Sequence, residues 1–161
     1  YCLLHPVSRR ASKQWTKKAF VNIVDHYINL GLKVVITSGP EDIERNYVKD
    51  IAALTKKDFI DLGGKTSLLE LAAIIKDAKF FIGLDSVASH LAAAVGTSGV
   101  SLFGPSNPVN WRPWSDKITV ISRDGTEDNC QKHGHLEGKY KNCLCYISPE
   151  RVIEEIDKII S

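Results

Sequence analysis

Methionine is absent from this sequence of 161 residues. The chain opens instead on Tyr1-Cys2-Leu3-Leu4-His5, which has the apolar character of a buried strand. A natural cytosolic protein begins with Met and usually continues with a few polar residues. We therefore expect a fragment, cut just ahead of the first strand of a domain, with further chain upstream.

Long apolar runs and strong charge are also missing. No run approaches the roughly 18 apolar residues that a membrane-spanning helix needs. The formal net charge is +2 at pH 7, too small for a field that would favour nucleic acid as a partner. The composition, with 43% hydrophobic and 25% charged residues, is that of an ordinary globular protein. We expect a single domain with a substantial core.

Cysteine is scarce, and its four positions fit no compact disulfide framework of a small secreted domain. Cys2 stands in an apolar run and is expected to be a buried small hydrophobic residue. A structural zinc site is conceivable in a late polar segment, but a Cys-x-Cys pair without a second Cys-x-x-Cys is weak spacing. We favour a reduced-thiol loop without metal, with a Cys130–Cys143 or Cys130–Cys145 disulfide as the oxidised alternative. The candidate ligands in that segment are Cys130, His133, His135, Cys143 and Cys145.

The glycine motifs of the common nucleotide sites are absent as well. The sequence contains neither the Gly-x-x-x-x-Gly-Lys of a P-loop nor the Gly-x-Gly-x-x-Gly of a dinucleotide site. A nicotinamide or flavin cofactor is therefore not expected.

Short apolar runs alternate with amphipathic stretches along the chain. This alternation predicts βαβ units, a mostly parallel sheet and an α/β, Rossmann-like fold. The apolar runs predict strands over 1–5, 33–37, 59–61, 80–83, 99–103 and 118–122. Helical spacing predicts helices over 15–30, 41–54, 67–77, 87–95 and 149–160.

Local signals mark the ends of these helices. Gly31 is expected to end the first helix, and Ser67 with Glu70 forms the pattern of a capping box. Ser148 can cap the last helix, with Pro149 at its first position.

One segment shows neither the strand nor the helix period. It is polar, rich in Gly, His, Lys and Cys, and is predicted to be a long surface loop. We therefore divide the single domain into a βα core over 1–122, a loop over 123–147 and a C-terminal helix over 148–161.

Ligands bind outside the carboxyl ends of the strands in an open parallel sheet, so candidate residues are those that follow each strand. The first such stretch, "HPVSRRASKQW", combines hydroxyls with the cations Arg9, Arg10 and Lys13. These are the parts of an anion site, although a solvated basic loop has the same composition.

The next two strand ends carry weaker signals. Glu41 and Asp42 follow the second strand and can accept hydrogen bonds from ribose hydroxyls, unless they are simply the acidic first turn of a helix. The stretch 63–67 follows the third strand, and its glycines allow close approach of a flat group such as a purine. A tight turn would explain these glycines equally well.

The fourth strand end has the most distinctive pattern, "FIGLDSVASHLAAAV". The backbone N–H groups near Ser86 and Val87 open a helix and favour an anion such as a diphosphate. Asp85 would be repelled by phosphate and suits sugar hydroxyls better. His90 lies one turn into the helix and can donate to a phosphate oxygen, although a lone helical histidine is more often structural.

Together these stretches resemble glycosyltransferase family nine, the ADP-heptose:lipopolysaccharide heptosyltransferases. "DSVASH" resembles the family's Asp-Thr/Ser-x-x-x-His signature, between "SLLELAAIIKDAKFFIGLDS" and "LFGPSNPVNWRPW". "HPVSRRASKQW" is similar to its phosphate loop with Lys-x-Trp, and "SGPED" to its Gly-x-Pro-x-acid turn. The tail "NCQKHGHLEGKYKNCLCYISPERV" is similar to the branch that adds the third, side-branch heptose of the inner core.

The resemblance covers nearly the whole chain and implies the C-terminal, donor-binding half of a two-domain GT-B enzyme. It implies an inverting transfer of heptose from ADP-heptose to the lipopolysaccharide inner core. The implied donor-binding roles are Ser8, Arg9 and Lys13 at the diphosphate, Glu41 or Asp42 at the ribose, Thr66 beside the adenine, Asp85 at the heptose, and Ser86, Val87 and His90 completing the phosphate site.

The resemblance also implies what lies outside the chain. In this family the catalytic base is an Asp of the N-terminal domain, which also receives the acceptor. We therefore assign no catalytic residue within 1–161 and expect donor binding without turnover. No cofactor or metal is expected, because Lys13, Arg9 and the helix dipole can offset the diphosphate charge.

The implied location is the cytoplasm of a Gram-negative bacterium, at the cytoplasmic face of the inner membrane with peripheral contact to it. One alternative is a non-catalytic α/β nucleotide-binding or regulatory module. Such a module would bind ADP-like ligands without discriminating the sugar.

Overall fold

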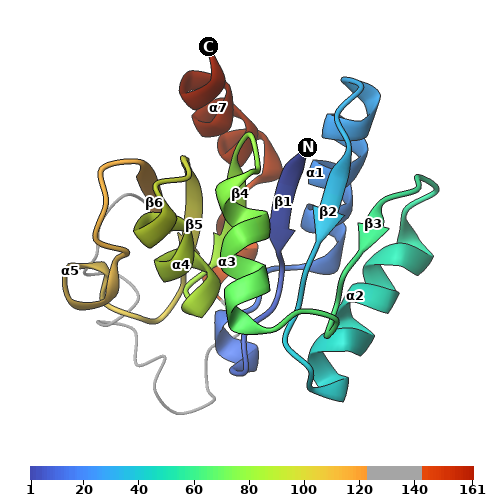
Figure 1. Ribbon diagram of the computed structural model, residues 1–161, viewed down its shortest axis with the longest axis horizontal. Coiled ribbons are helices and arrows are strands. Elements are labelled where there is room, and N and C mark those ends of the chain that lie inside the picture. Colours follow the sequence, from blue (N-terminus) through green and yellow to red (C-terminus); the bar gives the residue numbers. More distant parts are fainter. Residues whose placement is uncertain (123–142) are drawn as a thin grey trace.

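The computed structural model describes residues 1–122 and 143–161, and these residues contain one parallel sheet. The strand order is β3-β2-β1-β4-β5-β6, and every neighbouring pair is parallel. The prediction of a Rossmann-like α/β fold is confirmed. All carboxyl ends of the strands lie toward the lower edge of Figure 1. The bounds are β1 (Cys2–His5), β2 (Val34–Ile36), β3 (Ile60–Asp61), β4 (Phe81–Leu84), β5 (Gly99–Phe103) and β6 (Ile118–Ser122).

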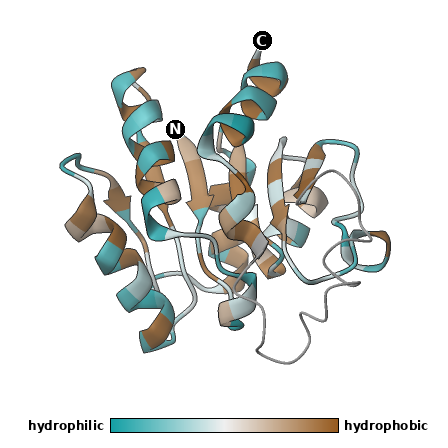
Figure 2. Cartoon of the chain, turned by 180° about the vertical axis from the view of Figure 1, so that it is seen from behind, coloured by the Kyte–Doolittle hydropathy of each residue, from teal (hydrophilic) through white to brown (hydrophobic). Residues whose placement is uncertain are grey.

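Helices cover both faces of this sheet, which explains why the strands are apolar on both sides. The apolar sides of α1, α2 and α7 join one core cluster with Cys2 and Leu4, whereas α3 and α4 join a second cluster with Leu3 and Phe81. Figure 2 shows the hydrophobic strands between helices of mixed hydrophilic and hydrophobic character. The bounds are η1 (Ala11–Lys13), α1 (Lys17–Asn29), α2 (Asp42–Leu54), α3 (Leu68–Lys76), α4 (Val87–Val95), α5 (Pro108–Trp111), η4 (Cys143–Tyr146) and α7 (Pro149–Ile160).

The predicted signals at the helix ends are confirmed. Gly31 has a φ of 81°, a left-handed conformation that suits glycine, directly after the last turn of α1. Both hydrogen bonds of the capping box between Ser67 and Glu70 are present. Ser148 accepts from the N–H of Arg151 at the start of α7.

Three local predictions were wrong or incomplete. The first helix begins at Lys17 and not at Trp15, because Thr16 caps it and the Trp15 side chain is buried, with Nε1 donating to the Ile147 carbonyl. The short helices η1 and α5 were not predicted, although Asn107 caps α5. The predicted loop over 123–147 contains the 3-10 helix η4, and its residues 123–142 lie outside the described residues.

A buried row of polar or small residues crosses four neighbouring strands near their carboxyl ends. His5 pairs with Gly83 of β4, which pairs with Ser101 of β5. On the other side, the His5 ring contacts Thr37, the residue that follows β2. The Ser101 hydroxyl shares a 2.8 Å hydrogen bond with Ser89 of α4. Polar groups therefore lie between the apolar core and the loops where ligands are expected.

No helix in the described part of the chain is both long and apolar enough to span a membrane.

Candidate functional site

The crevice between β1 and β4 is where the sheet changes its winding direction. In the sheet, β1 has β2 as its neighbour on one side and β4 on the other. The chain leaves β1 toward α1, which packs in the first core cluster, and leaves β4 toward α4, which packs in the second. Loops that part in opposite directions leave a crevice, and this is the usual ligand position in open α/β sheets.

An ion pair between Lys13 and Asp85 spans this crevice. Lys13 Nζ lies 2.5 Å from Asp85 Oδ2, and the side chains are 20% and 7% exposed. The two predicted site residues are 72 positions apart and come together only through the fold. Because the carboxylate is largely desolvated, removing Lys13 would leave a poorly compensated charge.

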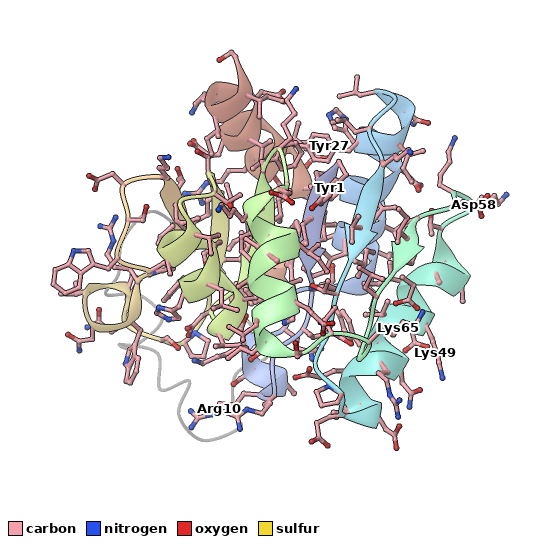
Figure 3. The ribbon with its side chains drawn as sticks, viewed as in Figure 1. Tyr1, Arg10, Tyr27, Lys49, Asp58 and Lys65 are labelled. Atoms are coloured by element: carbon pink, nitrogen blue, oxygen red, sulfur yellow. The ribbon has the colours of Figure 1, made fainter. Side chains whose placement is uncertain are left out.

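The loop that carries Lys13 is held by its own hydrogen bonds. The 3-10 turn η1 is closed by the N–H of Lys13 donating to the Arg10 carbonyl, and Gln14 Nε2 donates to the Ser8 carbonyl at 3.0 Å. Figure 3 shows Arg10 projecting at the edge where the strands end, whereas Tyr1 and Tyr27 lie toward the opposite edge. The predicted basic loop is therefore at the carboxyl edge, with a defined backbone.

Ser8 and Arg9 line a recess next to α2. Its volume is about 250 Å³, and Tyr47 and Asp50 of α2 form part of its opposite wall. Lys13 instead reaches toward β4. The structure thus directs the predicted diphosphate cations Arg9 and Lys13 to different sides of one loop.

The amino end of α4 lacks a side-chain cap. Ser86 is the N-cap residue, but its side chain accepts no capping hydrogen bond, and its Oγ is enclosed without a partner among the described residues. An enclosed hydroxyl without a partner costs free energy, which a bound ligand can recover. Val87 and His90 follow on exposed positions of the same helix. The arrangement fits the predicted anion position at this helix end.

The acidic turn after β2 differs from the prediction in one respect. Glu41 and Asp42 are exposed, and Asp42 forms an ion pair with Arg45 on the surface of α2. The buried acid of this turn is Glu44, which is 6% exposed and accepts from the Gly39 N–H at 2.7 Å. Glu44 was not among the predicted site residues, although its place in the first turn of α2 is a signal that the sequence offers.

The turn after β3 is joined to the turn after β2. The N–H of Gly64, whose φ is 69°, donates to the Ser38 carbonyl at 3.1 Å. Thr66 lies two residues further on and is half-buried. These two turns therefore form one wall of the site beside the crevice.

His5 is a buried histidine at the end of the central strand; it opens the predicted phosphate loop "HPVSRRASKQW" but was given no role of its own. It is 5% exposed, and its Nδ1 lies 2.9 Å from Thr37 Oγ1. Burial lowers the pKa of the ring from its ordinary value of 6.5 to about 4, because the charged form is poorly solvated there. His5 is consequently neutral at pH 7.

The candidate zinc ligands fall largely outside the described residues. This applies to Cys130, His133 and His135, and to the side chain of Cys143. Cys2 is buried, as predicted, and Cys145 is exposed; both are free thiols. Among the described residues no group of three or more His, Cys, Asp or Glu side chains is arranged to hold a metal ion.

The crevice thus combines an uncapped helix amino end, an amine and a carboxylate. The helix end and Lys13 suit a phosphate group, and Asp85 suits hydroxyls. These features of the α/β domain suit a ligand with both an anionic and a hydroxyl-rich part.

Comparison with known proteins identifies the family. Residues 1–141 match the model of glycosyltransferase family 9 (heptosyltransferase). The chain is 35% identical to lipopolysaccharide heptosyltransferase 3 of Escherichia coli K12 over 99% of its own length and 46% of that protein. This chain belongs to glycosyltransferase family 9, and it spans about half the length of that relative.

Solved structures agree with this assignment. The glycosyltransferase family 9 protein of Veillonella parvula superposes with a TM-score of 0.84 at 29% identity, over 99% of this chain and 45% of that chain. ADP-heptose lipopolysaccharide heptosyltransferase II of E. coli gives a TM-score of 0.83 at 26% identity, over 99% and 46%. The predicted family resemblance is confirmed.

We expect the stability of the chain to fall in acid because of His5. Between pH 6.5 and about 4 the unfolded chain binds a proton that the folded chain excludes. The free energy of unfolding therefore decreases as the pH drops through this window. Urea unfolding at pH 7 and pH 4.5 should show a loss roughly 2–3 kcal/mol larger for the natural chain than for His5→Asn. Equal pH dependence in both would contradict a neutral, buried His5.

Proposed function

We propose that this chain is the donor-binding half of an inverting heptosyltransferase of the lipopolysaccharide inner core. The observation that carries the proposal is the Lys13–Asp85 ion pair beside the uncapped end of α4. It supplies a cation and free N–H groups for the diphosphate of ADP-heptose and a carboxylate for the heptose. Relatives named for heptose transfer support the donor class.

Donor binding then exchanges partners within the crevice. The diphosphate takes Lys13 from Asp85 and accepts hydrogen bonds from the first turn of α4 and from Ser86. Asp85, no longer paired, accepts hydrogen bonds from heptose hydroxyls. His90 adds a donor to the phosphate site, and Arg9 approaches from the α2 side.

The adenosine part extends toward the joined turns after β2 and β3. Thr66 lies beside the adenine, and Glu41 or Asp42 accepts from the ribose hydroxyls. The exposure of these acids leaves them open to a ligand, while Glu44 fixes the turn behind them.

The chemistry is a single displacement. The oxygen of an acceptor hydroxyl forms a bond to the anomeric carbon of heptose, while the bond from that carbon to the phosphate oxygen breaks and ADP leaves with the electron pair. Lys13 and the α4 dipole stabilise the charge that develops on ADP. The hydroxyl proton passes to a base, which we place outside residues 1–161 together with the acceptor site.

A non-catalytic nucleotide-binding module is the second candidate. It is favoured by the fact that the groups identified in the crevice are suited to binding a ligand, and none of them is assigned as a catalytic base. Such a module would bind ADP and ADP-heptose alike, because no contact to the sugar would matter.

Lys13→Ala should weaken ADP binding at least tenfold. The substitution removes a charge-assisted hydrogen bond, whose contribution is about 1.5–3 kcal/mol, and leaves Asp85 to repel the diphosphate. Isothermal titration calorimetry with ADP measures the effect. Lys18→Ala is the matched control, because Lys18 is exposed on α1 and should change the dissociation constant less than twofold. A tight ADP complex of Lys13→Ala would remove this loop from the site.

Asp85→Asn should separate the sugar from the nucleotide. The amide keeps the shape of the carboxylate but releases Lys13, so ADP should bind as well or more tightly. ADP-heptose should lose its advantage over ADP, because two hydroxyl hydrogen bonds to a charged acceptor are weakened. Calorimetry with both ligands is the measurement. A non-catalytic module would show the same small change for both, and equal weakening of both would make Asp85 a structural residue.

Heptosyl transfer should require more than this chain. The 161 residues alone should bind ADP-heptose but give no ADP release with a heptose-acceptor core. Transfer should return when the chain is joined to the N-terminal acceptor domain that we place outside residues 1–161. Turnover by the chain alone would place the base here, with Asp85 and His90 as the candidates.

A further inference from the structure

His5 ends the central strand β1, from which the loop of Lys13 departs, but it has no role in the proposed donor site so far. It is the last residue of β1 and pairs with Gly83 of β4. Asp85 is two positions beyond Gly83, and its N–H continues the ladder by donating to the Leu102 carbonyl at 3.0 Å. Side chains alternate along a strand, so His5 and Asp85 face the same side of the sheet.

Thr37 decides which ring nitrogen of His5 carries the proton. The Thr37 hydroxyl has one proton and two acceptors in reach, His5 Nδ1 at 2.9 Å and the Leu4 carbonyl at 3.4 Å. The Leu4 carbonyl already accepts the N–H of Thr37 at 3.0 Å. We assign the hydroxyl proton to the shorter of the two contacts, with His5 Nδ1 as its acceptor. Nδ1 is then an acceptor, and the ring proton of a neutral His5 sits on Nε2.

Nε2 is the nitrogen of the His5 ring for which the described residues supply no partner. Among the described residues, the enclosed side-chain atoms without a partner are His26 Nε2, Tyr27 OH and Ser86 Oγ. His5 Nε2 is not one of these atoms and has no hydrogen-bond partner in that part of the chain, and the His5 residue as a whole is 5% exposed. Helices cover both faces of β1, and His5 is the last residue of this strand, next to the loop that carries Lys13.

A neutral donor at this place suits an anion. The ring stays uncharged at pH 7, since its pKa is about 4, and a neutral N–H can bind phosphate without a second buried charge beside Lys13. The Asp85 carboxylate is already available to accept hydrogen bonds from sugar hydroxyls. His5 therefore adds a hydrogen-bond donor to the site.

We propose that His5 donates a hydrogen bond from Nε2 to the diphosphate of the nucleotide, and that Thr37 is the positioning residue that holds the ring in the required tautomer. The inference rests on the proposed donor site and adds to it a contact from the carboxyl end of β1. His5 would touch the ligand, whereas Thr37 acts through His5.

Nitrogen NMR of histidine-labelled protein tests the tautomer and the contact. His5→Asn identifies the His5 signals by their loss. In the free chain we expect a protonated Nε2 and an unprotonated Nδ1, and ADP should shift the Nε2 signal and slow exchange of its proton. A protonated Nδ1 in the free chain, or His5 signals that ignore saturating ADP, would overturn the inference.

Variants of Thr37 provide an independent measurement. Thr37→Val removes the hydroxyl at nearly constant shape and should weaken ADP binding about three- to tenfold, with the two ring tautomers becoming mixed. Thr37→Ser keeps the hydroxyl and should restore both properties. Thr97→Val is the matched control, because Thr97 Oγ1 donates to the Ile75 carbonyl in a buried position away from the crevice. It should change stability without changing ADP affinity.

The outcomes separate this inference from the proposed function. If ADP binds and depends on Lys13, but neither His5 nor Thr37 matters, the donor site stands and the role of His5 falls. If the natural chain does not bind ADP at all, both fall. If Thr37→Ser and Thr37→Val weaken ADP binding equally, the hydroxyl of Thr37 is not what positions the ring.

Discussion

Hydrogen bonding between β1 and β4 is the constraint on which the rest of the site depends. The register pairs Leu3 with Phe81, Leu4 with Ile82 and His5 with Gly83, so the offset between the two strands is constant. This register brings the loop of Lys13 opposite Asp85. A shift by one residue would turn every side chain of β1 to the other face of the sheet. The geometry of the ion pair and the direction of the His5 ring would then both be lost.

Sequence could predict what depends on near neighbours. The alternation of apolar runs and amphipathic stretches predicted the sheet, and the capping box of Ser67 and Glu70 was predicted because its partners are three residues apart. The partnership of Lys13 with Asp85 could not be predicted, because it depends on the register of two distant strands. Glu44 was missed for a related reason: whether an acid in a first helical turn faces solvent or the preceding loop is decided by how α2 packs.

The polar groups of the proposed donor site differ in how well the protein itself satisfies them. Asp85 and Lys13 satisfy each other, whereas Ser86 Oγ remains enclosed without a partner among the described residues. Affinity for a ligand therefore reflects a difference, because the free energy of the new hydrogen bonds is offset by the cost of breaking the ion pair. A ligand with both an anionic and a hydroxyl-rich part replaces both halves of that pair, and an anion alone replaces one.

The unequal exposure of the basic residues on the β1 loop has a kinetic consequence. Arg9 and Arg10 are exposed, whereas the Lys13 side chain is 20% exposed. Mobile ions screen charges at the surface far more than charges inside a crevice. If the proposed donor binds here, the two arginines accelerate its encounter by long-range attraction, and added salt slows that encounter. The lifetime of the complex once formed is governed by the sheltered lysine and responds less to salt.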